Sequence, residues 1–204
     1  MNIIEPSVEI LDNIDGKELL KKLESYGRTC YKSESLISDD SAEKYIRMIL
    51  NRGHLSVIEH EKISARVICD RGVTHEIVRH RLASYSQEST RYCNYLKKGI
   101  TFINPIDFEL NEEDLKTLRL IEDHYNECIE HGRSPQQARY FLPNGLKTEI
   151  VITYNLREWR HFFTLRCDKT AHPQMRQIAN MLLDKIHNIV PIIFDDLYIK
   201  YIKE

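Results

Sequence analysis

The sequence has few of the features that mark disordered, exported and membrane-spanning chains. It contains only 7 glycines and 6 prolines in 204 residues, which leaves little room for low-complexity linkers. It has no uninterrupted run of about 18 apolar residues, and no basic region followed by an apolar stretch at its amino terminus. We therefore predict a globular chain that is neither exported nor bound in a membrane, with a cytoplasmic location.

The sequence also lacks a large net charge and a pairing pattern among its cysteines. Twenty-nine Lys and Arg residues against 31 Asp and Glu residues give a formal net charge of −2, so no global basic field is available to hold nucleic acid. The five cysteines are odd in number and form no Cys-x-x-Cys pair, which argues against a disulfide framework or a zinc ribbon. These absences predict a reducing compartment, no nucleic-acid partner, and anion binding only by local clusters of cations.

Three common nucleotide and catalytic motifs are missing. The sequence has no Gly-x-Gly-x-x-Gly loop, P-loop or Gly-x-Ser-x-Gly elbow, so the usual carriers of dinucleotide binding, phosphoryl transfer and serine-hydrolase chemistry are absent. HEIVRH superficially matches a zinc-protease motif, but its histidines, His75 and His80, are five residues apart and diverge on a helix. We reject a zinc site there and predict no metal.

The spacing of apolar residues predicts helices that alternate irregularly with strands. Helices are expected over residues 17–26, 42–50, 111–132, 156–166 and 173–189, and strands over residues 61–70 and 147–154. Gly72 is expected to end the first of these strands, Thr74 to cap a short helix through Arg79, and residues 84–90 to form a loop. Without linkers or repeats, residues 1–204 are predicted to be a single α+β domain, with two tightly fused halves as the alternative.

The densest cationic segment is RHRLASYSQESTR, residues 79–91, with three arginines against Glu88. Guanidinium groups bind phosphate in a bidentate manner, and hydroxyl and amide groups of an intervening loop can complete an oxyanion cradle. A solvated surface loop is the alternative, but apolar residues flank the arginines on both sides. This composition predicts a site for a phosphorylated ligand.

A second cationic stretch covers residues 157–176 and contains three aromatic side chains. Trp159, Phe162 and Phe163 are expected to form the core face of an amphipathic helix rather than a stacking platform. Arg157 lies three residues from Arg160 and four from His161, so this helix can present the three together.

RHRLASYSQESTR fits the RHR-x7-S-x-R signature of the flavin-dependent thymidylate synthases, and the chain resembles that family nearly end to end. Four further segments match the family in order and approximate spacing. They are GRTCYKS (27–33), GHLSVIEH (53–60), ARYFLP (138–143) and NLREWRHFFTLR (155–166). The resemblance implies a central, mainly antiparallel sheet packed by helices, assembled as a homotetramer whose active sites are shared between subunits.

The resemblance also implies the ligands and the reaction. Each site would bind FAD, deoxyuridine monophosphate (dUMP) and 5,10-methylenetetrahydrofolate, with NADPH reducing the flavin. The products would be thymidylate (dTMP) and tetrahydrofolate. Arg166 resembles the arginine that polarises the uracil by stabilising negative charge as the N3 proton is lost, and it is the expected catalytic residue.

By the same resemblance, the remaining site residues fall into two sets. The expected FAD contacts are His54, Ser56, Arg79, His80, Arg81, Gln87, Asn155, Leu156, Arg157 and His161. The expected dUMP contacts are Glu76, Ile77, Val78, Arg79, Gln87, Glu88, Ser89, Thr90, Arg91, Arg139 and Arg166.

Two of these positions depart from the family pattern, since Glu76 stands where glutamine is common and His161 where asparagine occurs. An acid beside an anionic nucleotide is costly unless it hydrogen-bonds the uracil or pairs with an arginine.

An enzyme nucleophile is not expected, although cysteines and the signature serine are available. Cys93 and Cys167 follow arginines but have no neighbouring histidine to activate them, and the loop around Ser89 supplies arginines instead of a base. Two other functions compete with the synthase: an RNA-binding module, which the net charge disfavours, and a catalytically silent nucleotide-binding protein of the same fold.

Overall fold

The computed structural model describes residues 1–203, which divide into two compact units. Unit 1 contains Met1–Ser7, Val67–Arg79 and Tyr85–Val151. Unit 2 contains Val8–Arg66, His80–Ser84 and the described residues from Ile152 on. The prediction of a single domain over residues 1–204 stays a prediction.

The strands confirm the α+β class. One sheet has the strand order β2 (Ser7–Ile10), β3 (Lys62–Asp70), β6 (Lys147–Asn155) and β4 (Ala83–Gln87). A second, two-stranded sheet pairs β1 (Asn2–Ile4) with β5 (Thr101–Ile103) in parallel. The boundary between the units crosses all four strands of the larger sheet, and each part is described with its own unit.

In unit 2, contacts between β3 and β6 show that the two strands run antiparallel. The Leu156 amide donates to the Glu61 carbonyl at 3.0 Å, and the Thr153 hydroxyl donates to Ser64 Oγ at 2.9 Å. Moving forward along one strand therefore means moving backward along the other. In β3 every second side chain, beginning with Ile63, is buried, as its alternating sequence predicts.

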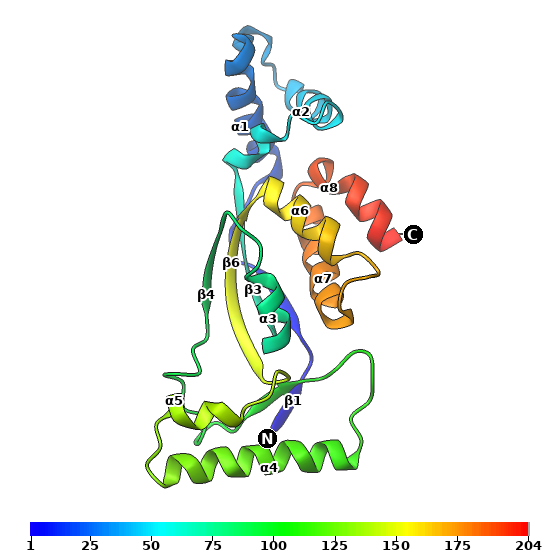
Figure 1. Cartoon of the computed structure of the whole chain (residues 1–204). Helices are drawn as coiled ribbons and strands as arrows, with labels where there is room; N and C mark the ends of the chain where they lie inside the picture. Colours follow the sequence, from blue (N-terminus) through cyan, green and yellow to red (C-terminus); the bar gives the residue numbers. More distant parts are fainter. Residues whose placement is uncertain (204) are drawn as a thin grey trace. The chain divides into compact units, whose positions relative to one another are not determined.

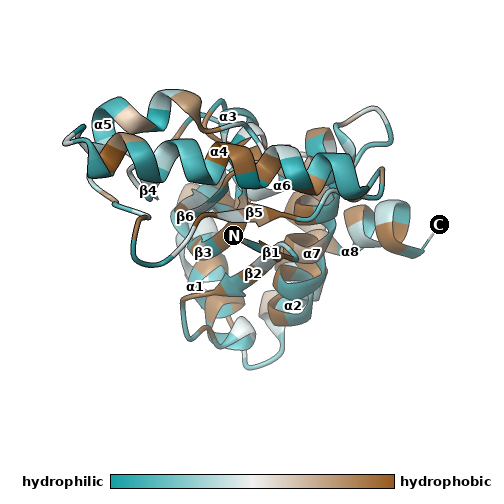
Figure 2. Cartoon of the chain, turned by 90° about the horizontal axis from the view of Figure 1, so that it is seen from below, coloured by the Kyte–Doolittle hydropathy of each residue, from teal (hydrophilic) through white to brown (hydrophobic). Residues whose placement is uncertain are grey.

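The helices of unit 1 are α3 (Arg71–Ile77), α4 (Glu112–Glu130) and α5 (Pro135–Ala138), which continues into the 3₁₀ turn η4 (Arg139–Phe141). Asn111 starts α4 with a reciprocal capping box to Asp114, and Gly132 follows its end with φ +84°. Figure 1 shows α4 and α5 side by side, and Figure 2 shows α4 mostly hydrophilic with scattered apolar residues. The apolar stripe of α4 buries Tyr125 and Cys128.

The longer helices of unit 2 are α1 (Gly16–Arg28), α2 (Ser41–Asn51), α6 (Leu156–Arg166), α7 (Pro173–Ile189) and α8 (Pro191–Tyr198). Short turns η1 (Thr29–Tyr31), η2 (Glu34–Leu36), η3 (Leu55–His60) and η5 (Ile199–Lys203) complete this unit. Helix α6 packs against α7 and α8 (Figure 1). Trp159, Phe162 and Phe163 of α6 are fully buried, as expected for its core face, and Trp159 Nε1 donates to the Ile63 carbonyl at 3.0 Å.

Some local predictions are wrong for identifiable reasons. Gly72 does not end β3, because Asp70 caps α3 by accepting from the Val73 amide at 2.8 Å, which places Gly72 within the helix. A Cβ at Gly72 would lie 2.9 Å from Asp70 Oδ1, so glycine makes room for the cap. Thr74 is not the cap, since its hydroxyl donates to the Arg71 carbonyl at 2.9 Å inside the helix.

The polar segment of residues 84–90 is also not simply a loop. Its first part lies in β4, where cross-strand hydrogen bonds override the low apolar content. Helix α8 was not expected either. Only Val190 separates it from α7, and Pro191 occupies its first position, where proline is tolerated.

Across the described range 1–203, no helix is both long enough and apolar enough to cross a membrane.

Candidate active site

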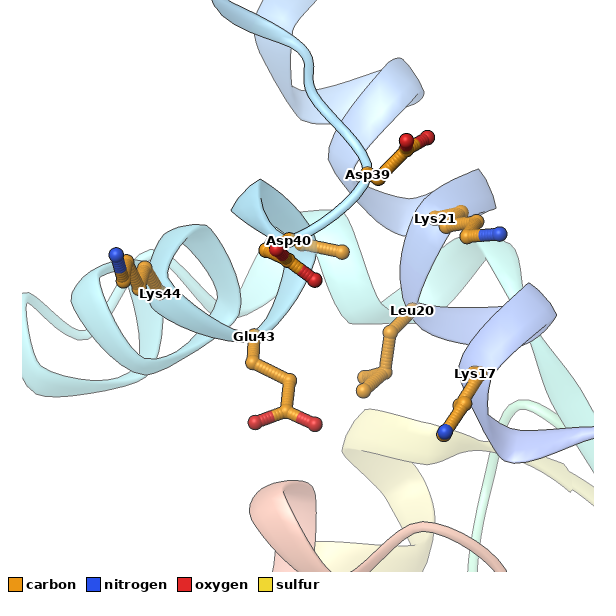
Figure 3. Close-up of a pocket in the computed structure, with 8 residues that line it drawn as sticks. Lys17, Leu20, Lys21, Asp39, Asp40, Glu43 and Lys44 are labelled. Atoms are coloured by element: carbon orange, nitrogen blue, oxygen red, sulfur yellow. The ribbon is translucent and has the colours of Figure 1, made fainter.

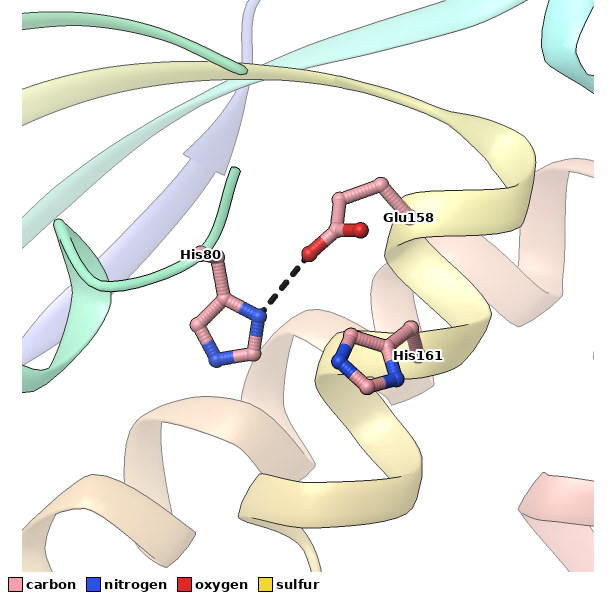
Figure 4. Close-up of side chains that lie close together, drawn as sticks. All are labelled: His80, Glu158 and His161. Atoms are coloured by element: carbon pink, nitrogen blue, oxygen red, sulfur yellow. Dashed lines mark hydrogen bonds and ion pairs between the residues drawn. The ribbon is translucent and has the colours of Figure 1, made fainter. Parts of the chain in front are cut away.

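A buried histidine from the cationic signature is the centre of the site in unit 2. His80 is only 5% exposed, and its Nδ1 lies 2.9 Å from Glu158 Oε1 on α6 (Figure 4). Arg166 is the last residue of α6, and its Nε lies 3.1 Å from His80 Nε2. Asn155 caps α6 by accepting from the Glu158 amide at 2.8 Å, which fixes the first turn of the helix and with it the backbone of Glu158.

The contacts determine which ring nitrogen of His80 carries the proton. An arginine Nε–H can only donate, so His80 Nε2 must accept from Arg166. The proton of the neutral ring therefore lies on Nδ1, which donates to Glu158. Burial lowers the pKa of His80, the hydrogen bond to Glu158 raises it and the Arg166 charge lowers it, with a net shift below the ordinary value. His80 is thus neutral at neutral pH.

His80, Glu158 and His161 also lie within cation-binding distance of one another, with ligand atoms no more than 4.8 Å apart. Both ring nitrogens of His80 are already engaged, since Nδ1 faces Glu158 and Nε2 faces Arg166. A metal ion would have to displace the guanidinium or the carboxylate. The geometry therefore describes a hydrogen-bonded chain rather than a vacant ligand set.

Other expected flavin contacts in unit 2 lie on or beside α6. The Arg81 guanidinium is exposed and forms no ion pair or hydrogen bond with any described residue. Arg157 is exposed and pairs with Glu59 at 2.5 Å, and His161 is exposed with its ring 5.7 Å from that of His80. Leu156 is fully buried, so neither its side chain nor its backbone is open to a ligand in this structure.

Arg160 does not join Arg157 and His161 as the spacing suggested. Its guanidinium forms two hydrogen bonds with Asp196, at 2.7 and 2.6 Å, and also donates to the Ile193 carbonyl. Arg160 therefore ties α6 to α8 and is a structural residue. The tertiary contact decided this, because helical spacing alone cannot say which arginine faces a neighbouring helix.

His54 and Ser56 are exposed and border a hollow of about 390 Å³ formed by α1, α2 and η3. Its other walls are mixed in character, with the aromatic rings of Tyr31 and Tyr45, the thioether of Met48 and the guanidinium groups of Arg28 and Arg52. Ligand pockets usually combine apolar and aromatic walls with a few polar groups, and this hollow has both. The GHLSVIEH segment is thus placed on a concave surface.

Leu82 is a candidate contact that the sequence analysis missed. Its φ is +62° and its side chain is 82% exposed. A left-handed backbone is uncommon for a non-glycine residue, and such conformations cluster at ligand sites. Its position directly after Arg81 in the signature was the available signal.

In unit 1, the side chains of Gln87 and Glu88 fix the middle of the RHR-x7-S-x-R segment through hydrogen bonds to neighbouring residues. Gln87 donates to the hydroxyls of Thr74 and Thr148, at 3.0 and 3.3 Å. Glu88 accepts from the Tyr95 hydroxyl at 2.9 Å and from Lys147 Nζ at 2.8 Å. Their side chains are thus engaged within the protein, and Glu88 is neutralised by a cation.

The expected phosphate-binding residues of unit 1 follow directly in the chain. Arg139 donates to the hydroxyl of the buried Thr90 at 3.2 Å, and Arg91 Nε donates to Gln136 Oε1 at 2.8 Å. The Ser89 Oγ accepts from the Arg91 amide at 3.3 Å. Helix α5 and the turn η4 thus connect to the signature through two arginines, which carry no carboxylate partner in the described hydrogen bonds and ion pairs.

The end of α3 contributes residues of different exposure. Arg79 is exposed, and no described residue bonds to its guanidinium. Glu76 is half-buried and the Val78 side chain is exposed. Ile77 is fully buried and its carbonyl accepts from the Tyr85 hydroxyl at 2.9 Å, so neither its side chain nor its backbone is open to a ligand in this structure.

Two of the five cysteines are buried thiols that do not ionise readily. Burial raises the pKa of the Cys167 thiol to about 12 and raises that of Cys69 as well. All five cysteines are free thiols.

A larger hollow of about 510 Å³ lies between α1 and α2 (Figure 3). Charged residues of both signs line it: Lys17, Lys21, Asp39, Asp40, Glu43 and Lys44. None of the residues predicted for the site lies there.

Known proteins resemble this chain in sequence and in structure. The family model described as thymidylate synthase complementing protein matches residues 10–192. A flavin-dependent thymidylate synthase from Pyrococcus furiosus is 36% identical over 168 residues, covering 79% of this chain and 69% of the relative. One from Geobacter sulfurreducens is 32% identical over 180 residues, covering 83% and 78%.

A solved structure extends the comparison to the fold. The UMP/dUMP methylase PolB from Streptomyces cacaoi, bound with 5-Br dUMP, has a TM-score of 0.76 at 18% identity, with 98% of each chain covered. At that identity the likeness concerns the fold alone. The sequence matches span the cationic signature, the His80 cluster and the capped helix α6, and from them it follows that this chain belongs to the flavin-dependent thymidylate synthase family.

Proposed function

We propose that the protein methylates dUMP to dTMP, with 5,10-methylenetetrahydrofolate as carbon donor and NADPH-reduced FAD as hydride source, releasing tetrahydrofolate. The observation that carries this proposal is the state of the signature RHR. Arg79 and Arg81 are exposed and unpaired among the described residues, on either side of a buried, doubly hydrogen-bonded His80. An anionic ligand requires guanidinium groups that no protein carboxylate has neutralised. The two arginines next to His80 in the sequence meet this requirement, which a loop with a purely solvent-exposed role would not need.

The residues of unit 2 fit FAD. Arg81 would bind the phosphates of FAD. The side-chain NH₂ group of Asn155 would donate to the cofactor, because only the side-chain oxygen is used in the helix cap. His54, Ser56 and the aromatic wall of the neighbouring hollow offer an apolar surface with polar edges. When bound, the reduced flavin would supply the hydride that completes the new methyl group.

The residues of unit 1 fit a nucleotide monophosphate. Arg91 and Arg139 are held by neutral partners, Gln136 and Thr90, which leave their positive charges uncompensated. The Ser89 hydroxyl retains its proton for donation, since its oxygen accepts from the Arg91 amide. Two arginines and a hydroxyl suit phosphate oxygens.

Arg166 would act on the pyrimidine. Its charge is permanent, so it stabilises negative charge on the uracil as N3 loses its proton and does not itself remove that proton. The polarised C5 of the pyrimidine would then bond to the methylene carbon carried by the folate, the bond from that carbon to the folate nitrogen would break, and C5 would release its proton. The protein would position and polarise the reactants without a covalent link to them.

The test of this proposal is tritium release from dUMP labelled at C5, with NADPH, FAD and methylenetetrahydrofolate present. Release coupled to dTMP formation is the expected result. Protein that binds FAD and dUMP but releases no tritium would instead be a catalytically silent member of the family.

Ser89→Ala should weaken dUMP binding and leave measurable turnover, because the described polar partner of the Ser89 hydroxyl is the Arg91 amide and not a base. Steady-state kinetics should show a higher KM with kcat reduced less than tenfold, about what a lost neutral hydrogen bond costs. Mass spectrometry during turnover is the control. An adduct of the pyrimidine with Ser89 or with any cysteine would refute a mechanism without an enzyme nucleophile.

We also propose a homotetramer in the cytosol. Five free cysteines suit a reducing compartment. Large apolar side chains are exposed on both units, among them Tyr31, Leu36, Tyr92 and Tyr140, and such residues are common at subunit interfaces. Light scattering should give about four times 24.2 kDa; an active monomer would exclude sites shared between subunits.

A further inference from the structure

Glu158 has no assigned role, yet it is the residue that anchors the buried histidine of the site. Its backbone amide is held by the Asn155 cap, and its side chain is only 14% exposed. Its Oε1 lies 2.9 Å from His80 Nδ1 (Figure 4). The carboxylate is therefore fixed at its base by the helix start and at its tip by the imidazole.

We propose that Glu158 is a positioning residue that holds His80 in the Nδ1-protonated tautomer, so that Nε2 remains an acceptor that orients the Arg166 guanidinium. This inference rests on the proposed function, because it assigns Glu158 to the placement of the arginine that polarises the pyrimidine. It assigns no bond making or breaking to Glu158 itself.

The geometry makes the tautomer consequential. A neutral histidine carries its proton on either Nδ1 or Nε2. The hydrogen bonds that these two nitrogens make decide which of them is protonated. A proton on Nε2 would face the Arg166 Nε–H across 3.1 Å, which places two donors against each other. The Arg166 Nε–H would then lose this acceptor, and the contact that orients the guanidinium toward His80 would be repulsive.

Two groups around His80 favour the proton on Nδ1: Glu158 accepts it, and Arg166 donates to Nε2. Tyr154, His161, Phe162 and Arg166 surround the ring, together with Glu158. The His161 ring meets His80 edge-on at 5.7 Å, and Phe162 does so at 5.0 Å, so both limit ring rotation without bonding the Nδ1 proton. Glu158 alone among these residues offers an ionised acceptor.

The experiment compares Glu158→Gln with Glu158→Met in the flavin-loaded protein. Gln retains an oxygen that can accept from Nδ1, whereas Met keeps a similar length and removes the acceptor. Histidine ring ¹⁵N NMR, with the His80 signal assigned by a His80→Gln variant, reports the tautomer directly. We expect Nδ1 to be protonated in the parent and in Glu158→Gln. In Glu158→Met we expect a measurable population with Nε2 protonated, because the Nδ1 proton has lost its acceptor while only the Arg166 contact still favours Nε2 as an acceptor.

Kinetics give the second readout. In Glu158→Met we expect kcat to fall about ten- to a hundredfold, the order of losing one hydrogen bond to a charged group, with KM for dUMP within about threefold of the parent. Glu158→Gln should retain most of the activity. Asp195→Ala is the matched control, because Asp195 bonds His187 at 2.9 Å in the same unit, at neither a predicted flavin nor a predicted nucleotide contact.

The outcomes separate this inference from the proposed function. If the parent forms no dTMP, the proposed function fails, and the NMR spectra still decide whether Glu158 sets the tautomer. If the parent is active and Glu158→Met keeps both the parent tautomer and the parent kcat, the inference is overturned. It is also overturned if Asp195→Ala lowers kcat as much as Glu158→Met. If Glu158→Met does not fold, Glu158→Ala is measured against the same criteria.

Discussion

Arg166→Ala should abolish most dTMP formation while the protein still binds FAD. The removed guanidinium is the charge that would stabilise the ionised uracil, and deleting one such preorganised donor costs about 10²- to 10³-fold in kcat, roughly 3–4 kcal/mol. FAD should remain bound because Arg81 and the Asn155 amide are not altered. Flavin absorbance of the purified variant and dTMP formation by single turnover measure the two effects separately.

Arg166→Lys is the informative control for that variant. Lysine keeps the charge but loses the planar fork and the Nε–H that donates to His80 Nε2 at 3.1 Å. Its rate should therefore lie between those of the parent and Arg166→Ala. Normal turnover in Arg166→Ala, with normal dUMP binding, would remove Arg166 from the catalytic role.

Arg81→Ala should yield protein largely free of flavin. Arg81 has no protein partner among the described residues, so its removal leaves no buried group unsatisfied and should not destabilise the fold. The loss of a charge-assisted hydrogen bond to phosphate costs about 1.5–3 kcal/mol, which weakens FAD binding roughly 10- to 150-fold. Titration of the apoprotein with FAD, followed by flavin fluorescence, measures this change.

Arg119→Ala on α4 is the matched control for Arg81→Ala. Arg119 is also an exposed arginine, but it lies on a helix that carries none of the predicted site residues. Its removal should leave FAD affinity unchanged. An Arg81→Ala protein that binds FAD as tightly as the parent would show that the signature arginine is a surface residue.

Local sequence patterns predicted the main elements because their causes are local. The alternation around Ile63 predicted a half-buried strand, and Asn155 before an apolar helical pattern predicted a cap and its helix. The aromatic residues of α6 were correctly assigned to the core on the same basis. Predictions failed where a residue served a non-local or competing interaction, as with Gly72 beside the Asp70 cap and the segment that became β4.

The site shows the same division. RHR-x7-S-x-R by itself determined which residues are chemically suited to anions, since arginine charge and hydroxyl donors are properties of the side chains. Spacing could not decide between Arg157 and Arg160, and only the bidentate contact with Asp196 shows that Arg160 serves the α6–α8 packing.

The sequence by itself determined the family, the element types and the anion-binding chemistry of the signature. Only the tertiary structure decided that His80 is buried between Glu158 and Arg166, 78 and 86 residues away in the chain. Such contacts depend on how strands and helices pack, and no periodicity within either segment encodes them. The tautomer of His80, and with it the orientation of Arg166, is therefore a property of the folded protein, because burial excludes the water that would otherwise satisfy either ring nitrogen.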